Sequence, residues 1–212
     1  IEVTDAIDGH IEKIMKSLGA AAQAAPAGKK KARKLKVVVD CCNAAGSVIA
    51  PKLLRKLGCE VVELYTDTTK LFPHEAEPLP KNLKALCAAV KKNKADIGFA
   101  LDPDADRLAL IGNDGKPLGE ERTLVLAADA FFSLAKGKQK KGPFVVNLSC
   151  SLAMDDVAKK HGVAIYRTKI GEAHVVAGMH KHNAPMGGEG NGGVIFPAVH
   201  PGRDAATAIA WI

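Results

Sequence analysis

The sequence predicts an α/β protein built from two three-layer α/β/α domains with mixed, mainly parallel sheets. Short apolar runs rich in β-branched residues alternate with segments of helical periodicity, which is typical of β-α-β units. The run 96–101 lacks polar alternation, as in a strand covered on both faces. The β-α-β order restarts near residues 116–119, so we expect domains at 1–117 and 118–212.

The first half is expected to open with a helix at 10–18, followed by a flexible linker at 19–34. A β-α-β unit comes next, and Gly58 is placed to end its helix. Asn113-Asp114-Gly115 predicts a hairpin turn between apolar runs at 108–111 and 116–118. The remaining elements are predicted strands at 35–39, 59–64 and 96–101, with helices at 48–57 and 82–93.

The second half is expected to repeat this organisation around a basic loop at 136–142 and a glycine-rich turn at 187–193. Gly162 is placed to cap one of its helices. The predicted helices cover 122–135, 152–161, 173–182 and the segment from 204 onward, and the predicted strands cover 144–148, 163–168, 185–189 and 194–196.

The net charge of +7 suggests an anionic partner, such as a phosphosugar or a nucleic acid. Much of the excess lies in the basic run 29–36, whose surroundings are typical of a solvated linker. No aromatic residue interleaves with the run, as single-strand binding would favour. A nucleic-acid-binding protein is therefore an alternative, and we do not expect nucleic acid as the partner.

The five cysteines form no CxxC pair, which indicates neither a zinc site nor a redox motif. Buried thiols are typical of a reducing compartment, so we expect a cytoplasmic protein. No apolar stretch of about 18 residues is present, so we expect no membrane span.

Three aspartates alternate directly after the predicted buried strand 96–101: Asp102, Asp104 and Asp106. Crowded carboxylates repel one another unless a cation neutralises them. Hard oxygen ligands at the carboxyl end of a strand suit Mg²⁺ or Ca²⁺. Arg107 adds a bidentate donor for a phosphate.

Three other kinds of loop share part of this pattern. A calcium EF-hand would need Gly and Glu where the chain has Arg107 and Asn113, so it fails. An aspartyl-phosphate-type phosphatase also places Asp-x-Asp after a buried strand, although Asp106 does not fit its motif, and it stays an alternative. An acidic solvent turn is disfavoured, because crowding three aspartates against a buried strand is costly without a cation.

The glycine-rich turn permits close ligand approach, and it holds Gly188, Glu189 and Asn191. The carboxylate and amide groups suit vicinal sugar hydroxyls, although a flexible hairpin explains the pattern equally well. Lys169 follows another strand end and is a candidate for binding an anion. For His74 the expected role is that of a hydrogen-bonded loop histidine.

Asp102–Arg107 resembles the metal loop of the α-D-phosphohexomutases, the phosphoglucomutase/phosphomannomutase/phosphoglucosamine mutase superfamily. The segment 188–193 resembles the sugar-binding loop of their third domain. Similarity runs from about Ile7 to the end, with supporting matches at 39–47, 72–78, 168–171 and 200–205.

The resemblance implies that the chain corresponds to domains 2 and 3 of a four-domain enzyme, with domains 1 and 4 absent. Such an enzyme moves a phosphoryl group between a phosphoserine and a hexose phosphate, by way of a bisphosphate intermediate, and so interconverts hexose 1- and 6-phosphates. By this resemblance Asp102, Asp104 and Asp106 hold Mg²⁺, and Arg107 lies near the phosphoserine. Lys169, Gly188, Glu189 and Asn191 are then the substrate-binding residues.

Some positions depart from the family pattern. The phosphoserine motif and the phosphate-gripping domain are missing, so we expect no turnover by this chain alone. Many members have Ser and His where Asn191 and Gly193 stand, and others have His at the place of Glu172. The Asn-Gly-Gly form resembles archaeal-type and phosphoglucosamine mutase-like members, which leaves glucose, mannose and glucosamine phosphates all open as substrates.

Overall fold

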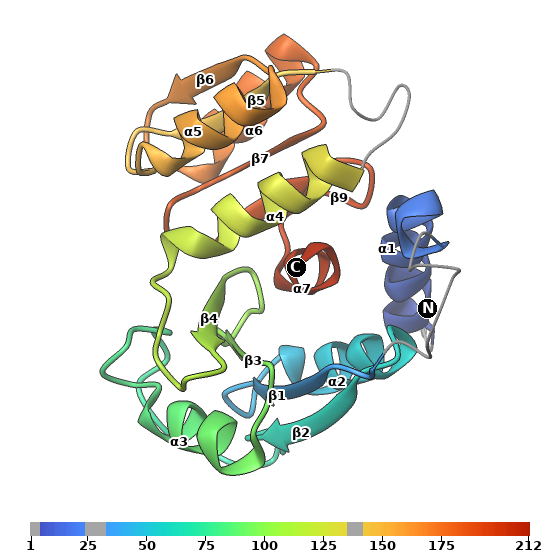
Figure 1. Cartoon of the computed structure of the whole chain (residues 1–212), viewed down its shortest axis with the longest axis vertical. Helices are drawn as coiled ribbons and strands as arrows, with labels where there is room; N and C mark the ends of the chain where they lie inside the picture. The colour runs from blue at the N-terminus through green and yellow to red at the C-terminus, as the bar shows by residue number, and fades with distance from the viewer. Residues whose placement is uncertain (1–4, 24–32, 135–141) are drawn as a thin grey trace.

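The computed structural model describes residues 5–23, 33–134 and 142–212. Its first sheet has the strand order β2-β1-β3-β4 (Figure 1). The pairs β1–β2 and β1–β3 are parallel, whereas β3–β4 is antiparallel. The strands are β1 Lys36–Asp40, β2 Glu60–Leu64, β3 Ile97–Leu101 and β4 Leu108–Gly112.

The second sheet has the order β6-β5-β7-β8-β9. Strand β5 pairs in parallel with β6 and β7, and the pairs β7–β8 and β8–β9 are antiparallel. This sheet is therefore evenly mixed, and over both sheets four of the seven strand pairs among the described residues are parallel, which confirms the predicted α/β class with mixed, mainly parallel sheets. Its strands are β5 Phe144–Asn147, β6 Ile165–Thr168, β7 Met186–Gly188, β8 Val194–Phe196 and β9 His200–Arg203.

Side-chain alternation along the strands divides each sheet into two buried faces. In β1, Val37 and Val39 enter one hydrophobic cluster, while Val38 enters another beneath α3 Lys84–Asn93. In β5, Phe144 and Val146 join the same cluster as Val37, and Val145 packs with α6 Glu172–His182. One core thus extends between the two sheets.

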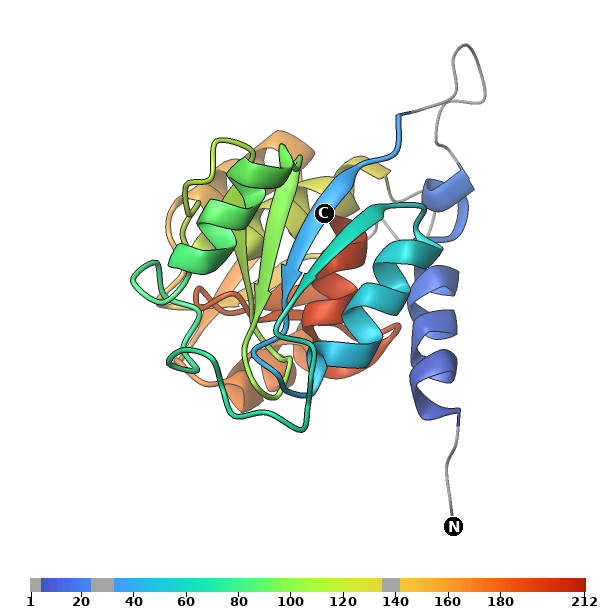
Figure 2. The ribbon, with the colours of Figure 1, turned by 90° about the horizontal axis from the view of Figure 1, so that it is seen from below.

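The helices between the sheets fill that shared core. Figure 2 shows the first sheet with α3 on one side and α2 on the other, and α1 outside α2. The C-terminal helix α7 contacts α1, α2 and α4, and so joins both halves of the chain. The helices that contribute side chains to this core are α1 Ala6–Gln23, α2 Gly46–Lys56, α4 Glu121–Leu134, α5 Ala153–His161 and α7 Ala205–Trp211.

Most predicted elements are present within a few residues, and Gly162 caps α5 in a left-handed conformation as expected. Helix α1 continues past the predicted linker start at Gly19, where the backbone is kinked, to Gln23. The rest of that linker at 24–32, and the basic loop up to residue 141, lie outside the described residues.

Two details of the strands differ from the prediction. The predicted turn at 113–115 is present, and the N–H groups of Gly112 and Leu118 donate across it to the carbonyl oxygens of Lys116 and Leu110, each at 2.9 Å, but residues 116–118 form no regular strand. Strand β9 was not predicted, because Pro201 and Gly202 are rare in strands and hide the short segment. No helix in the described part of the chain is long and apolar enough to cross a membrane.

Candidate metal and sugar-phosphate site

The three aspartates lie in the turn that joins β3 to β4. One carboxylate oxygen from each of Asp102, Asp104 and Asp106 lies within 4.8 Å of the others. Asp102 is buried, Asp106 is partly buried and Asp104 is exposed. The structure therefore brings together the carboxylates that the sequence singles out, with one side open to solvent.

Asp102 organises the turn through hydrogen bonds to its carboxylate. Oδ1 accepts from the backbone N–H groups of Asp106, at 3.1 Å, and Arg107, at 3.0 Å. Oδ2 accepts from Nε of Arg107 at 2.6 Å. Ala105 has a φ of 59°, so the chain curls tightly enough for these bonds to form.

The electrostatics of the turn favour a cation. Burial, together with the neighbouring Asp102 carboxylate, raises the pKa of Asp106 to about 6, although the Arg203 guanidinium opposes the shift. A carboxylate that is reluctant to ionise beside two others is the expected state of a cluster without a counter-ion. Three such oxygens fit a hard divalent ion, to which they would offer part of a coordination shell.

Arg107 is fully engaged by carboxylates in this structure. Besides the bond from Nε to Asp102, its Nη1 and Nη2 donate to the two carboxylate oxygens of Glu77 at 2.9 Å and 3.2 Å. Burial works against the guanidinium charge, but these two carboxylates outweigh it and raise the Arg107 pKa above its usual value. An anion approaching this arginine therefore meets Glu77 first.

The glycine-rich turn lies directly against the aspartate turn. The Leu108 N–H donates to the Gly192 carbonyl at 3.2 Å, and Arg107 pairs with Gly193 in an antiparallel bridge. Gly192 has a φ of +92°, and a Cβ there would lie 2.5 Å from the Leu108 carbonyl oxygen. Only glycine permits this approach, which connects the two predicted sites.

Glu189 is buried, and three groups from different elements bind its carboxylate. Oε1 accepts from Nδ2 of Asn147 at 2.8 Å and from the Gly171 N–H at 3.0 Å. Oε2 accepts from Nη1 of Arg203 at 3.2 Å. In this conformation Glu189 joins the end of β5, the start of α6 and the end of β9.

The other predicted sugar contacts differ in exposure. Lys169 is exposed, and its ammonium group has no hydrogen-bond or ion-pair partner among the described residues. Asn191 is partly buried and accepts from the Gly193 N–H at 3.3 Å through Oδ1. Gly188 is buried in β7, where a Cβ would lie 2.3 Å from the Gly193 carbonyl oxygen. Their binding roles stay predictions.

Sequence reasoning did not select four residues that shape the site: Glu77, Asn147, Glu172 and Arg203. Arg203 binds Asp106, Glu172 and Glu189, and so reaches both turns. Its presence in the segment 200–205, which resembles the family, was an available signal. Glu77 carried the same signal, because it lies in the segment 72–78, whereas Asn147 lies in none of the matching segments and its partner is distant in sequence.

His74 has the loop-anchoring role expected for it. Its Nδ1 lies 2.8 Å from the Glu75 carbonyl oxygen and its Nε2 lies 3.1 Å from Oδ2 of Asp40. Burial raises the pKa of Asp40, which ends strand β1, although His74 and the Cys42 N–H oppose the shift. The loop that carries Glu77 is thus fixed to the first sheet.

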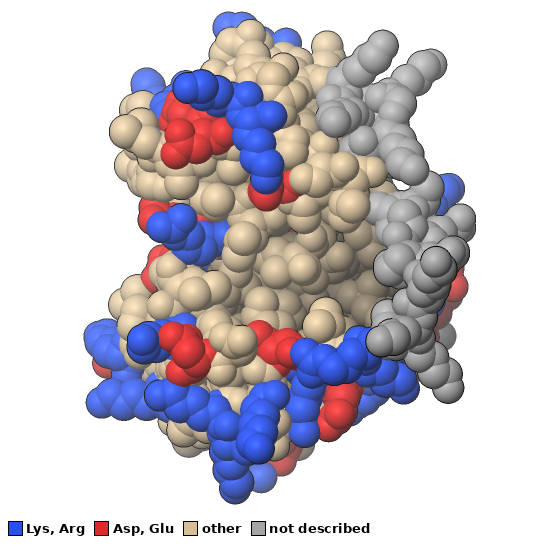
Figure 3. All heavy atoms as spheres, viewed as in Figure 1, with Lys and Arg blue, Asp and Glu red and all other residues tan. Residues whose placement is uncertain are grey.

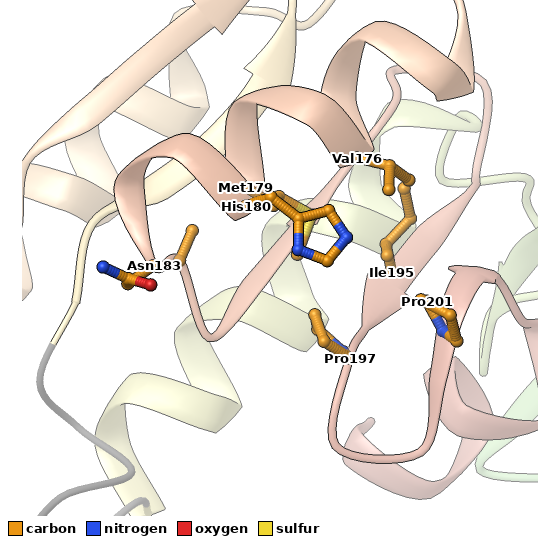
Figure 4. A pocket seen from close by; sticks show the side chains of 8 residues that line it. Val176, Met179, His180, Asn183, Ile195, Pro197 and Pro201 are labelled. Carbon is orange, nitrogen blue, oxygen red and sulfur yellow. The ribbon is translucent and has the colours of Figure 1, made fainter.

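A separate cavity of about 270 Å³ lies between α6 and the β8–β9 connection (Figure 4). Val176, Met179 and Ile195 give it an apolar lining, and the His180 ring projects over it. None of the site carboxylates lines this cavity. The carboxylate cluster and the cavity are therefore distinct features of the molecule.

Charges of both signs share the face shown in Figure 3. Lysine and arginine side chains gather over α3 and β2, with acidic side chains among them, and uncharged side chains cover the middle. Within the basic run, Arg33 pairs with Asp96 and Lys36 pairs with Glu60 at 2.8 Å. These pairs engage two of the three basic residues that the structure describes in the run, whereas the third, Lys34, is exposed. The charge that the described part of the run offers to a nucleic acid is thereby reduced.

Two family models match the chain. Residues 8–115 match phosphoglucomutase/phosphomannomutase, alpha/beta/alpha domain II, and residues 120–212 match alpha/beta/alpha domain III. A probable phosphoglucosamine mutase of Methanopyrus kandleri is 34% identical over 217 residues, which cover 100% of this chain and 44% of that relative. The chain thus spans less than half the length of this relative.

Solved structures share the fold. A phosphoglucomutase/phosphomannomutase family protein from Burkholderia thailandensis has a TM-score of 0.76 and 29% identity, covering 96% of this chain and 42% of that one. An N-acetylphosphoglucosamine mutase of Aspergillus fumigatus, in complex with GlcNAc-6P and magnesium, has a TM-score of 0.64 and 18% identity, covering 96% and 49%. The second likeness concerns the fold alone.

Proposed function

The chain belongs to the phosphoglucomutase/phosphomannomutase family, and from this premise we propose that it is the central part of a Mg²⁺-dependent phosphohexomutase. The whole enzyme interconverts hexose 1-phosphate and hexose 6-phosphate through a phosphoserine and a bisphosphate intermediate. The observation that carries the proposal is the convergence of three aspartate oxygens within 4.8 Å, beside Arg107 and the glycine-rich turn.

In this proposal Asp102, Asp104 and Asp106 hold Mg²⁺, which neutralises charge on the transferred phosphoryl group when bound. Arg107 binds phosphate after its hydrogen bonds to Glu77 have broken. The magnesium reported with the Aspergillus fumigatus protein supports the choice of metal. In this proposal residues 1–117 hold the metal, and residues 118–212 make the sugar contacts. Gly188 shapes the glycine-rich turn, and Lys169, Glu189 and Asn191 are the residues that contact the phosphosugar.

The phosphoserine and the grip on the second phosphate come from domains 1 and 4, which we propose as partners of this chain within one enzyme. Binding and turnover are therefore separable. The chain alone is expected to bind Mg²⁺, and to catalyse no mutase reaction.

Metal binding is tested by isothermal titration of the chain with MgCl₂. We expect heat and a raised Tm in the wild type, and neither in Asp104→Ala. Asp114→Asn is the matched control, because Asp114 is an exposed turn aspartate whose only side-chain partner in the described part of the chain is Lys116. Equal responses from Asp104→Ala and the wild type would refute the magnesium site.

Turnover is tested by joining the chain to the flanking regions of a relative and assaying glucose, mannose and glucosamine 1-phosphates. We expect at least one to be converted to its 6-phosphate, and we expect conversion to be lost in Asp104→Ala. A chimera that folds and binds Mg²⁺ but converts none of the three would contradict the mutase assignment.

The phosphatase alternative is disfavoured by the burial of Asp102, the residue that would be its nucleophile. Both of its oxygens already accept hydrogen bonds, from Arg107 and from backbone N–H groups. We expect no hydrolysis of para-nitrophenyl phosphate by this chain with Mg²⁺. Hydrolysis by the wild type that is lost in Asp102→Asn would favour the phosphatase instead.

A further inference from the structure

Arg203 lies at the end of β9 and contacts carboxylates from both halves of the chain. Its Nη2 pairs with Asp106, its Nε lies 3.2 Å from Oε2 of Glu172, and its Nη1 lies 3.2 Å from Oε2 of Glu189. Among the described residues, no other side chain forms ion pairs with both the aspartate turn and the glycine-rich turn. Arg203 is mostly buried, which strengthens these interactions.

The backbone around Arg203 holds its side chain in place. Oε1 of Glu172 accepts from the Arg203 N–H at 2.9 Å, so Glu172 binds this residue at two points. The aliphatic part of the side chain crosses Gly193, where an added Cβ would lie 2.3 Å from Cδ and 2.9 Å from Cγ. Any side chain at 193 therefore excludes Arg203 from its observed position.

We propose that Arg203 is a positioning residue that couples the metal turn to the sugar turn, and that Gly193 is required because the Arg203 side chain occupies its space. The coupling part rests on the proposed magnesium site. A bound cation attracts the Asp106 carboxylate and therefore weakens the ion pair between Asp106 and Arg203. The Arg203 guanidinium then pairs more strongly with Oε2 of Glu189. The other oxygen of Glu189, Oε1, accepts from the Gly171 N–H, so the Gly171 hydrogen bond reports on this change.

The packing part is tested without metal, by a double-mutant cycle in urea. Gly193→Ala should destabilise the wild type, and should have little effect when Arg203→Ala has removed the side chain from above it. We expect a coupling of about tenfold in the unfolding equilibrium constant. Arg203→Gln keeps Cγ and Cδ, so in that background the alanine should remain destabilising. Additive effects in the Arg203→Ala background would overturn the packing claim.

The coupling part is tested by amide hydrogen exchange at Gly171 with and without Mg²⁺. In the wild type, saturating Mg²⁺ should change the Gly171 exchange rate by about fivefold or more. Arg203→Gln should still bind Mg²⁺ by titration calorimetry and lose this response, and Arg203→Lys should restore part of it. The control Arg55→Gln, which removes a pair with Glu63 on another surface, should respond like the wild type.

Three results would count against the coupling. An unchanged Gly171 response in Arg203→Gln, or a wild type that binds Mg²⁺ without any response, overturns the role of Arg203 and leaves the metal site standing. Failure of the wild type to bind Mg²⁺ overturns the metal site and the coupling together. The urea cycle then still decides whether Arg203 and Gly193 form one packed unit.

Discussion

Nε2 of His10 lies 2.8 Å from Oδ2 of Asp204, so a hydrogen bond joins the first helix of the chain to the residue that caps the last one. Oδ1 of Asp204 accepts from the Ala206 and Thr207 N–H groups at the start of α7. This contact fixes α1 against α7, beside the core that both sheets share.

The His10–Asp204 pair should make stability depend on pH. The bond to Asp204 raises the pKa of His10 above 6.5, against the effect of burial. The pKa of Asp204 is lowered from 3.8, because hydrogen bonds from His10 and Thr207 outweigh burial. A raised histidine pKa adds stability that is complete below 6.5 and is lost as pH rises through the folded value.

We therefore expect His10→Gln to cost about 1 kcal/mol in urea unfolding at pH 6, and much less at pH 8.5. The pair also weakens in acid, as pH falls through the lowered pKa of Asp204. His174→Gln is the control, because His174 is exposed on α6. If His10→Gln lowered the free energy of unfolding equally at both pH values, the ionic contribution of the pair would be refuted.

Mg²⁺ binding should weaken in mild acid because Asp106 must lose its proton. Its pKa of about 6 means that most molecules carry a neutral Asp106 at pH 5. We expect the Mg²⁺ Kd to be about tenfold higher at pH 5 than at pH 7.5, with proton release seen in buffers of different ionisation enthalpy. Asp106→Asn should bind more weakly and lose most of this pH dependence; a flat wild-type profile would contradict the prediction.

Glu77 should compete with anions for Arg107, because it occupies both terminal nitrogens of the guanidinium. Glu77→Gln removes this charge and should tighten binding of inorganic phosphate in the presence of Mg²⁺ by about twofold to fivefold. Titration calorimetry measures the change. Glu75→Gln is the control from the same loop, since Glu75 pairs with Lys81. Equal effects from the two variants would mean that removing any one negative charge from this loop tightens phosphate binding, and would contradict a specific role of Glu77.

Gly192→Ala should destabilise the chain by about 2 kcal/mol or more, because its positive φ and the close Leu108 carbonyl both exclude a Cβ. Gly9→Ala is the control, with open space and an ordinary helical position, and should stabilise α1 by up to about 1 kcal/mol. Urea unfolding compares the two. A neutral Gly192→Ala would mean that the two turns can separate freely.

Much of the fold could be predicted because its signals are local. Apolar runs such as 144–147 identify strands without reference to their partners, and Gly162 marks the end of a helix through its own backbone conformation. The segment 200–203 was missed because it pairs as a strand despite its proline and glycine. Its position depends on β8, which supplies the partner that local propensity does not reveal.

The candidate site also has a part with local signals, which could be predicted, and a part that depends on distant partners, which could not. The aspartates at 102, 104 and 106 and the glycine-rich turn could be identified from local sequence, because spacing along the chain and backbone freedom are properties of short segments. The contact between these turns, the cover of Glu77 over Arg107 and the bonds from Arg203 to both Asp106 and Glu189 become visible in the folded chain alone. These pairings join distant segments, and they follow from how the helices between the two sheets fill one shared core.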